Sequence, residues 1–333
     1  RKVISKLKLR ASYGQVGNAN LGGRRFAYLS TITDDYDTLN MYKWGLDSSY
    51  GLTGMAEGEF AVQDLTWEIV NKMNLGVELG FLNGMIDLQL DYFDERRKDI
   101  FMPRESVPMT AGFMKQPWKN FGKVTNQGVE VSLNVNKQFG KDLFVSLMGT
   151  FTYAHNEITE KDEPSAVVGT NRAETGHPVG QLTGYIAEGL FTEDDFEDVS
   201  TGKLKEGIPT QSFVSKLRPG DIRYRDVNGD GKVDVFDKSP IGGTKDPEIV
   251  YGFGLNMKYK DLDFGALFQG IGRSWNILGS SIIPGANRGV TGNMFTNAND
   301  RWTVDNPSQN VFYPRLDDGI NSNNNQPSTW WLR

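Results

Sequence analysis

Residues 72–92 read KMNLGVELGFLNGMIDLQLDY, and this stretch decides the fold. Apolar side chains occupy every second position, with polar or small residues between them, on both sides of an Asn83-Gly84 pair. A period of two gives a β-strand one apolar face and one polar face. Asn-Gly between two such runs is the strongest short hairpin signal, because both turn residues need a positive φ. The stretch therefore predicts two antiparallel strands joined at Asn83-Gly84.

The length of these strands indicates where the protein resides. Each has about ten alternating residues, whereas a strand of a soluble protein usually has about five or six. About ten residues is the length that a tilted strand needs to cross a lipid bilayer. The hairpin is therefore typical of a transmembrane β-barrel.

The same alternation recurs along the chain and predicts about seven strands, too few and of the wrong parity for a closed single-chain barrel. We therefore expect the chain to be a piece of a longer protein. Beyond the first hairpin, strands are expected near residues 7–13, 129–136, 143–153, 253–259 and 262–268.

Short and long connections alternate strictly between the predicted strands. The short ones lie at Asn83-Gly84, residues 138–142 and Lys260-Asp261, and the long ones at about residues 14–64, 103–125, 155–248 and 273–326. Outer-membrane barrels have this plan, with short turns in the periplasm and long loops outside. We expect residues 156–248 to form an extracellular loop region that is functional or has structure of its own.

Composition excludes several classes of protein. The chain has 333 residues, a net charge of -6 and no Lys/Arg block, which argues against a nucleic-acid surface. It has no cysteine, so disulfides, thiolate zinc sites and cysteine nucleophiles are excluded. No apolar run is long enough for a transmembrane helix, although alternating barrel strands never produce such a run.

One sharp local motif is the segment DVNGDGKVDVFD at residues 226–237, which matches a calcium loop. Gly231 takes the sharp turn at the sixth position. The twelfth ligand is an Asp instead of the usual Glu, so its reach is shorter and the expected affinity lower. The alternative is an acidic turn held by its own Asx hydrogen bonds. The expected ligands are Asp226, Asn228, Asp230, the carbonyl of Lys232, Asp234 and Asp237.

Other residues with possible chemistry have simpler explanations. His155 and His177 are too far apart in sequence to form a motif and are expected to be loop residues. The acidic segment 193–198 is expected to be a solvated loop, since glycoside hydrolysis needs two carboxylates at a set separation. Trp118 and Trp302 are candidates for contact with a substrate or a partner, with packing inside the loops as the alternative. We therefore expect no enzyme.

Several motifs occur in one order across the whole chain. They are LKLRASYGQVGN at residues 7–18, Trp67-Glu68 leading into residues 72–76, residues 91–93, 126–130, 176–180 and 219–224, and the loop at 226–237 followed by Ile241-Gly242. In this combination the chain resembles the SusC/RagA family of TonB-dependent outer-membrane transporters.

The resemblance implies an all-β fold, part of a 22-stranded antiparallel transmembrane β-barrel of the Bacteroidetes type with long extracellular loops. Residues 1–333 would be its C-terminal part, without the plug and the final strands. Apolar faces would contact outer-membrane lipid, and polar faces would line the lumen around the plug.

The resemblance also implies TonB-dependent import of a large nutrient, an oligosaccharide or a peptide, across the outer membrane of a Gram-negative bacterium. A SusD-like surface lipoprotein would be the partner, and TonB would act through an N-terminal region absent here. One alternative is a secreted calcium-stabilised β-rich adhesin or glycan-binding domain, which does not explain the ten-residue alternation. Another is a secreted polysaccharide hydrolase, for which no acid-base pair is identifiable.

Overall fold

The computed structural model describes residues 3–33, 42–44, 50–52, 55–113, 115–278, 295–317 and 321–333. The chain divides into two compact units. We call the first the sheet unit; it comprises Arg1–Val168, Ala173–Val179 and Glu248–Gly272. We call the second the loop unit; it comprises Gly169–Arg172, Gly180–Pro247 and Arg273–Arg333.

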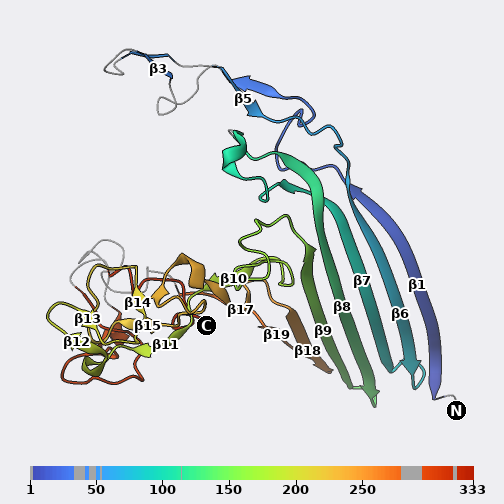
Figure 1. The fold of residues 1–333 in the computed structure, drawn as a ribbon. Coiled ribbons are helices and arrows are strands. Elements are labelled where there is room, and N and C mark those ends of the chain that lie inside the picture. The colour runs from blue at the N-terminus through green and yellow to red at the C-terminus, as the bar shows by residue number, and fades with distance from the viewer. Residues whose placement is uncertain are drawn as a thin grey trace. The chain divides into compact units, whose positions relative to one another are not determined.

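Seven strands of the sheet unit form a single antiparallel sheet, which confirms the all-β fold and the predicted hairpins (Figure 1). Neighbours in the sheet follow the order of the chain, as an up-and-down meander requires. The strands are β1 (Ile4–Asn18), β6 (Glu68–Phe81), β7 (Ile86–Pro103), β8 (Trp118–Phe139), β9 (Leu143–Glu160), β18 (Ile249–Tyr259) and β19 (Leu262–Gly272). The sheet is open, so closure into a barrel of 22 strands remains a prediction.

The tight turns lie where the sequence predicts them. In the first hairpin Phe81 pairs with Ile86, so the loop spans residues 82–85 rather than Asn83-Gly84 alone. Leu82, Asn83 and Gly84 have φ values of 52, 59 and 83°. Asn and Gly tolerate these positive values, which explains the Asn-Gly pair. The left-handed backbone begins one residue earlier than predicted, at Leu82. The other turns are residues 140–142 and Lys260-Asp261.

The strands are longer than predicted. β6 has 14 residues and β8 has 22, against an expected alternating length of about ten for a membrane crossing. β8 already begins at Trp118, so the connection from β7 is residues 104–117, shorter than the predicted 103–125. The sequence predicts that the strand after Asn83-Gly84 continues toward Phe101, and β7 does so. Alternation misses the early start of β8 because side chains on both faces there are polar, as Asn126 and Gln127 illustrate.

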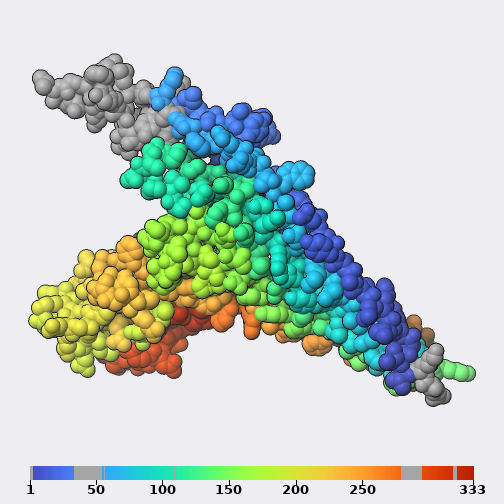
Figure 2. Space-filling model, turned by 45° about the vertical axis from the view of Figure 1, so that its right-hand side comes forward, coloured from blue at the N-terminus to red at the C-terminus, as the bar shows by residue number. Residues whose placement is uncertain are grey.

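The remaining elements of the sheet unit are short. They are β2 (Thr31–Thr33) paired with β5 (Ala56–Glu59), β3 (Tyr42–Trp44) paired with β4 (Tyr50–Leu52), and the 3-10 helix η2 (Met109–Ala111). In the space-filling view, the long strands from blue β1 to green β9 lie side by side as bands (Figure 2).

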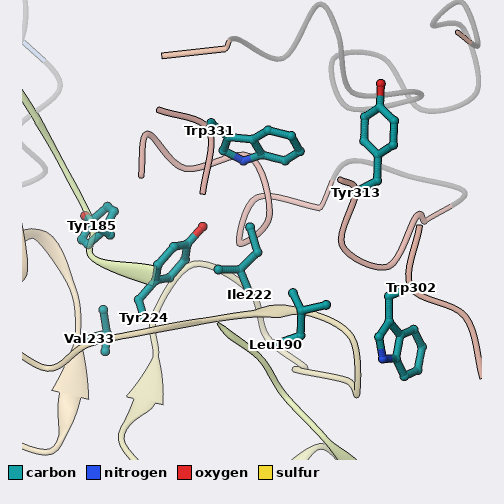
Figure 3. Packing of buried hydrophobic residues seen from close by; sticks show 8 residues of the cluster. All are labelled: Tyr185, Leu190, Ile222, Tyr224, Val233, Trp302, Tyr313 and Trp331. Carbon is teal, nitrogen blue, oxygen red and sulfur yellow. The ribbon is translucent and has the colours of Figure 1, made fainter. Parts of the chain in front are cut away.

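The loop unit consists of short strand pairs around an aromatic core (Figure 3). The pairs are β10 (Gln181–Gly184) with β17 (Ser239–Thr244), β11 (Ala187–Leu190) with β15 (Ile222–Tyr224), β12 (Phe196–Asp198) with β13 (Lys203–Leu204), and β14 (Thr210–Gln211) with β16 (Lys232–Val233). Its described residues also form the 3-10 helices η3 (Glu193–Asp195), η4 (Val235–Asp237) and η6 (Thr296–Asn299). The core residues are Tyr185, Leu190, Ile222, Tyr224, Val233, Trp302, Tyr313 and Trp331.

Much of the region predicted as a long loop thus has its own strands and core. Burial raises the pKa of Tyr185 to about 12, as expected for a phenol inside such a core. In the described part of the chain, no helix is long and apolar enough to cross a membrane.

Candidate functional site

One face of the seven-stranded sheet is built from apolar side chains. Residues opposite one another on neighbouring strands lie on the same face, so the register aligns them in rows. The middle row consists of Leu7, Leu79, Leu88, Leu133, Gly149, Phe253 and Phe268. Leu9 and Leu262 on this face are 73% and 74% exposed. A contiguous exposed apolar face of this kind marks a contact with lipid or another protein.

Aromatic side chains mark both borders of this apolar face. Tyr92 and Tyr153 lie in its row nearest the long connections, and Phe139 and Tyr259 in the row beside the tight turns. We call the border nearest the long connections the upper border and the one beside the tight turns the lower border. Beyond the upper border the same face becomes polar, with Asp94, Gln127 and His155 in the next row. Aromatic girdles at two edges of an apolar band are characteristic of transmembrane barrels.

The opposite, polar face has a ladder of ion pairs across β1, β6 and β7. Lys6 Nζ lies 2.8 Å from a Glu78 carboxylate oxygen, and Lys8 Nζ lies 3.2 Å from the other. Arg10 Nη2 lies 2.9 Å from Asp91 Oδ1. Gly76 makes room for this pair, because a Cβ there would lie 2.4 Å from Asp91 Oδ1. The charges of this face therefore largely neutralise one another.

A shallow hollow of about 240 Å³ lies on the polar face beside this ladder. Glu78, Asp87 and Gln89 contribute its acidic and amide groups, and Ser132 and Asn134 continue it onto β8. Leu79 and Leu88 also line the hollow, but most of its lining residues carry hydrogen-bonding groups, so it suits a polar partner or a water-filled passage.

Trp118 lies at the beginning of β8 with its ring in contact with two side chains. The Arg24 guanidinium lies 4.1 Å from the ring centroid, and the Phe101 ring centroid lies 5.1 Å away. Arg24 is in turn held by Glu59, with a nitrogen–oxygen distance of 2.9 Å. A substrate that stacks on this indole must therefore compete with Arg24.

Asp162 fixes the connection between β7 and β8 to the end of β9. It accepts hydrogen bonds from Arg104 Nε at 2.8 Å and from the Ser106 hydroxyl at 2.9 Å. Burial disfavours its charged form, but the bonds from Arg104 and Ser106 outweigh that effect and lower the pKa of Asp162. No pattern in the sequence indicates this anchor.

The segment predicted to bind calcium is a tight turn in which carboxylates accept backbone amides. Asp226 accepts the amides of Gly229 at 2.6 Å and Gly231 at 2.7 Å. Both glycines have a positive φ, 76 and 84°, as the motif requires. The next two side chains behave alike: Asn228 Oδ1 accepts from the Asp230 amide, and Asp230 Oδ1 accepts from the Lys232 amide.

Asp237, the expected twelfth ligand, is fully buried and closes the turn. Its Oδ1 accepts the Val227 amide at 2.8 Å, and its Oδ2 accepts the Asp234 amide at 2.7 Å. Lys232 Nζ pairs with Asp234 at 3.1 Å.

Among the described residues, no group of three or more His, Asp or Glu side chains is placed to hold a metal ion. The carboxylates face amides, so calcium would require them to turn toward a shared centre. Calcium binding remains a prediction, and the Asx-bonded turn is the arrangement present.

Trp302 is buried, with 6% of its surface exposed, and belongs to the core of the loop unit. A Cβ on Gly220 would lie 2.3 Å from its ring, so the backbone packs directly against the indole. Contact of Trp302 with a substrate would therefore need this core to open.

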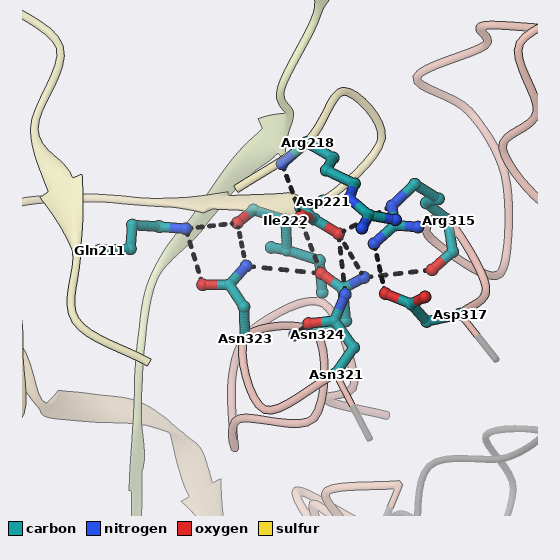
Figure 4. Close-up of polar contacts among 9 residues, drawn as sticks. All are labelled: Gln211, Arg218, Asp221, Ile222, Arg315, Asp317, Asn321, Asn323 and Asn324. Carbon is teal, nitrogen blue, oxygen red and sulfur yellow. Dashed lines mark hydrogen bonds and ion pairs between the residues drawn. The ribbon is translucent and has the colours of Figure 1, made fainter. Parts of the chain in front are cut away.

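A buried polar network links β15 to the segment 315–324 (Figure 4). Asp221 is fully buried and accepts hydrogen bonds from Asn321 Nδ2 at 2.9 Å and Asn324 Nδ2 at 3.0 Å. Arg315 Nε lies 3.3 Å from the same carboxylate. Burial raises the pKa of Asp221, and the Arg315 guanidinium opposes that shift. Residues about a hundred positions apart are joined here, which no local sequence signal could show.

The remaining titratable candidates have structural partners. His155 Nδ1 lies 2.5 Å from Glu248 Oε1. The backbone carbonyl of His177 accepts a hydrogen bond from the Ile158 amide. In the acidic segment 193–198, Asp195 accepts the Thr192 amide at 2.7 Å as a helix cap. The prediction that His155 is a loop residue is wrong, because His155 lies in β9 opposite Gln127. His177 lies in a connection outside the strands, as expected.

Comparison with known proteins gives the same fold. Residues 2–240 match the family model described as TonB dependent receptor-like, beta-barrel. TonB-dependent receptor P26 of Formosa agariphila is 27% identical over 322 residues, which are 93% of this chain and 30% of that protein. TonB-dependent receptor SusC of Bacteroides thetaiotaomicron is 29% identical over 269 residues, 79% of this chain and 24% of that protein. The chain therefore spans less than a third of each of these relatives.

Solved structures show the same strand arrangement. The RagAB peptide transporter is 23% identical with a TM-score of 0.66, and the match covers 99% of this chain and 32% of that one. The RagAB peptide importer in its open-open state is 22% identical with a TM-score of 0.67, over 99% and 32% of the two chains. At this identity the likeness establishes the fold alone.

Proposed function

The chain belongs to the TonB dependent receptor-like β-barrel family, and from that premise we propose that it forms part of the wall of an outer-membrane importer. The nutrient would be an oligosaccharide or a peptide too large for a porin. A SusD-like surface lipoprotein would be its partner. TonB would drive import through an N-terminal region that these residues do not include.

The observation that carries this proposal is the apolar band of the sheet. From Leu143 to Tyr153 on β9, and from Ile249 to Tyr259 on β18, the band runs between its two aromatic borders. At about 3.3 Å per residue over about ten steps, with a strand tilt of about 40°, its height is about 25 Å. That height matches the apolar band of outer-membrane barrels.

The polar face would then look into the lumen. Its ion pairs between Lys6 and Glu78 and between Arg10 and Asp91 neutralise the wall without a partner. If the charges of the wall are paired with one another, no strong ion pair between the wall and the plug has to break when the plug is displaced. Such a wall therefore suits a passage with a movable plug. The long connections would form the outer surface that meets the lipoprotein and the nutrient.

Membrane extraction and uptake together test the proposal. The full-length protein should leave isolated membranes only with detergent, and release by salt or carbonate would favour the secreted adhesin. A deletion strain should lose uptake of one labelled nutrient class and regain it on complementation. Glycoside hydrolase genes beside the transporter gene would direct the first trial to glycans, and peptidase genes to peptides. Unchanged uptake of both classes would contradict import.

Calcium would have a structural role in this protein. We propose that the loop at 226–237 binds one calcium ion through Asp226, Asn228, Asp230, Asp234 and Asp237 with the Lys232 carbonyl, and so stiffens an extracellular region. The support is the spacing of oxygen ligands around Gly231. Its competitor is the Asx-bonded turn, which already satisfies the same carboxylates.

Trp118 is the better placed of the two tryptophan candidates for substrate contact. It is only half-buried, at the end of β8 near the long connections, whereas Trp302 is buried in a core. Arg24 covers the Trp118 ring. If a substrate stacks on this ring, Arg24→Ala should raise the affinity of the protein for that substrate. An unchanged affinity in Arg24→Ala would exclude this role.

A further inference from the structure

A second hollow, of about 280 Å³, lies on the apolar face of the sheet at its upper border. Tyr92 on β7 and Tyr153 on β9 form its side walls, and Val129 on β8 lies between them in the same row. Neighbouring strands are about 4.8 Å apart, so the two tyrosines stand about 9.6 Å apart at their backbones. The smaller valine leaves the space between them open.

The sheet itself makes this hollow. β7, β8 and β9 each pair with a strand on both sides, so all three walls have neighbours in the sheet. At Gly128, beside the valine, a Cβ would lie 2.4 Å from the Phe93 ring. The backbone of β8 is therefore packed closely from the opposite face, which fixes the floor of the hollow.

The lining changes from apolar to polar along the strand direction. Below the tyrosines lie Leu90, Val131 and Phe151, in the next row of the apolar band. Above them the rim has Gln127 and His155 and then Thr125 and Glu157, which face each other across β8 and β9. Within the described residues, the side chains of Thr125 and Glu157 make no hydrogen bond or ion pair. A molecule that fills the hollow must therefore be apolar at the end toward the apolar band and polar at the end toward the long connections.

The rim also selects the kind of polar group. Arg96, which lies opposite Thr125, is paired with Asp94 at 3.0 Å, and Gln127 donates to the same carboxylate at 2.9 Å. His155 is paired with Glu248, so the strongest charges nearby already have partners. The Glu157 carboxylate would repel a phosphate but accepts hydrogen bonds from hydroxyls. Tyrosine rings present apolar faces to the C–H groups of a sugar ring. Hydroxyl-rich carbohydrate therefore fits better than a phosphate group.

We infer that this hollow binds one glycolipid of the outer leaflet, with a sugar of its headgroup between the tyrosines and an acyl chain along the apolar band. The inference rests on the proposed outer-membrane location, in which the long connections lie outside the cell. Such a lipid would anchor the wall at a fixed depth and orientation. It would also shield β7 to β9 from contact with other proteins.

Native mass spectrometry of the detergent-extracted full-length protein tests this inference. The probes are a rough-type lipooligosaccharide, its deacylated sugar core and phosphatidylethanolamine. Val129→Phe fills the floor of the hollow. Val77→Phe is the matched control, because Val77 lies on the same face but on β6, outside the strands that wall the hollow. We expect the lipooligosaccharide adduct to fall about tenfold in Val129→Phe, equivalent to about 1.4 kcal/mol, and to stay unchanged in Val77→Phe.

Three results would overturn the inference: equal adducts in the two variants, equal binding of phosphatidylethanolamine, or equally strong binding of the deacylated sugar. The heat-dependent gel shift of each variant shows whether it has folded. Tyr153→Leu, which keeps an apolar side chain, gives an independent arm if Val129→Phe does not fold. If the wild-type protein needs detergent for extraction but shows none of the expected adducts, the inference fails while the proposed location stands. If it is released without detergent, the proposed location itself fails.

Discussion

Replacing Leu133 by arginine perturbs the apolar band at its centre. Leu133 lies in the middle row, opposite Leu88 on β7 and Gly149 on β9. Gly149 leaves space beside it, because even a Cβ added to this glycine would lie 4.0 Å from the Leu133 Cβ. The cost of the arginine should therefore reflect transfer of its charge into the bilayer rather than a steric clash.

The magnitude follows from depth. An arginine on the lipid face costs about 2–4 kcal/mol at the bilayer midplane and about 0–1 kcal/mol near an interface. Leu133→Arg should therefore lower the ratio of folded to unfolded protein roughly 30- to 700-fold. Leu88→Arg in the same row should behave alike, and Phe139→Arg at the lower border should cost about 1 kcal/mol or less.

Reversible urea unfolding of the full-length protein from lipid vesicles measures these differences. Ser132→Arg is the matched control, because Ser132 is the next residue of β8 but lies on the polar face beside Gln89. It should cost well under 1 kcal/mol, because the arginine would enter the open polar hollow that Ser132 lines and would not face lipid. Equal costs for Leu133→Arg and Ser132→Arg would refute the assignment of the two faces.

Three further predictions concern polar anchors. Because the pKa of Asp162 is lowered, its stabilisation is present above its ordinary pKa of 3.8 and is lost as pH falls through the lowered value. Asp162→Asn should thus cost about 1.5–3 kcal/mol at pH 7, and the gap between its thermal midpoint and that of the wild type should narrow as pH falls below 3.8. A gap that does not change with pH would contradict the role of the Asp162 charge. Asp237→Asn should cost about 1–3 kcal/mol by leaving a buried amide unpaired. If the loop binds calcium, a chelator should lower the thermal midpoint of the wild type but not that of the variant, and an equal response of both would exclude calcium binding. Asp221→Ala should cost about 3–5 kcal/mol because Arg315 loses a buried partner, and proteolysis of residues 315–333 should accelerate; unchanged proteolysis would show that the network does not hold this segment.

The central part of each long strand could be predicted from sequence because one face differs sharply from the other. Alternation around Leu79, Leu133 and Phe253 placed all seven strands and the three turns. It failed on β8 before Val129 and on β9 beyond Tyr153, where both faces are polar and the strands continue without contrast between them. The missed extension of β8 back to Trp118 has this cause.

The sites outside the sheet were less predictable. Spacing identified the loop at 226–237, but the same carboxylates serve calcium or backbone amides, so the motif cannot distinguish the two. The Asp221–Arg315 network joins positions far apart in the chain, and its burial arises only from the packing of the loop unit. For the same reason, sequence could not show that Trp302 is buried and Trp118 half-buried.

Spin-label accessibility along β8 tests the central claim most directly, because this chain contains no cysteine of its own. Single cysteines at each position from 129 to 136 would be labelled in the full-length protein, cleared of other thiols and reconstituted in lipid. Labels at Val129, Val131, Leu133 and Val135 should be relaxed by oxygen dissolved in the bilayer and shielded from a water-soluble nickel reagent. Labels at the even positions should show no such preference for oxygen. Equal access of the nickel reagent to odd and even positions would contradict a lipid-facing barrel wall.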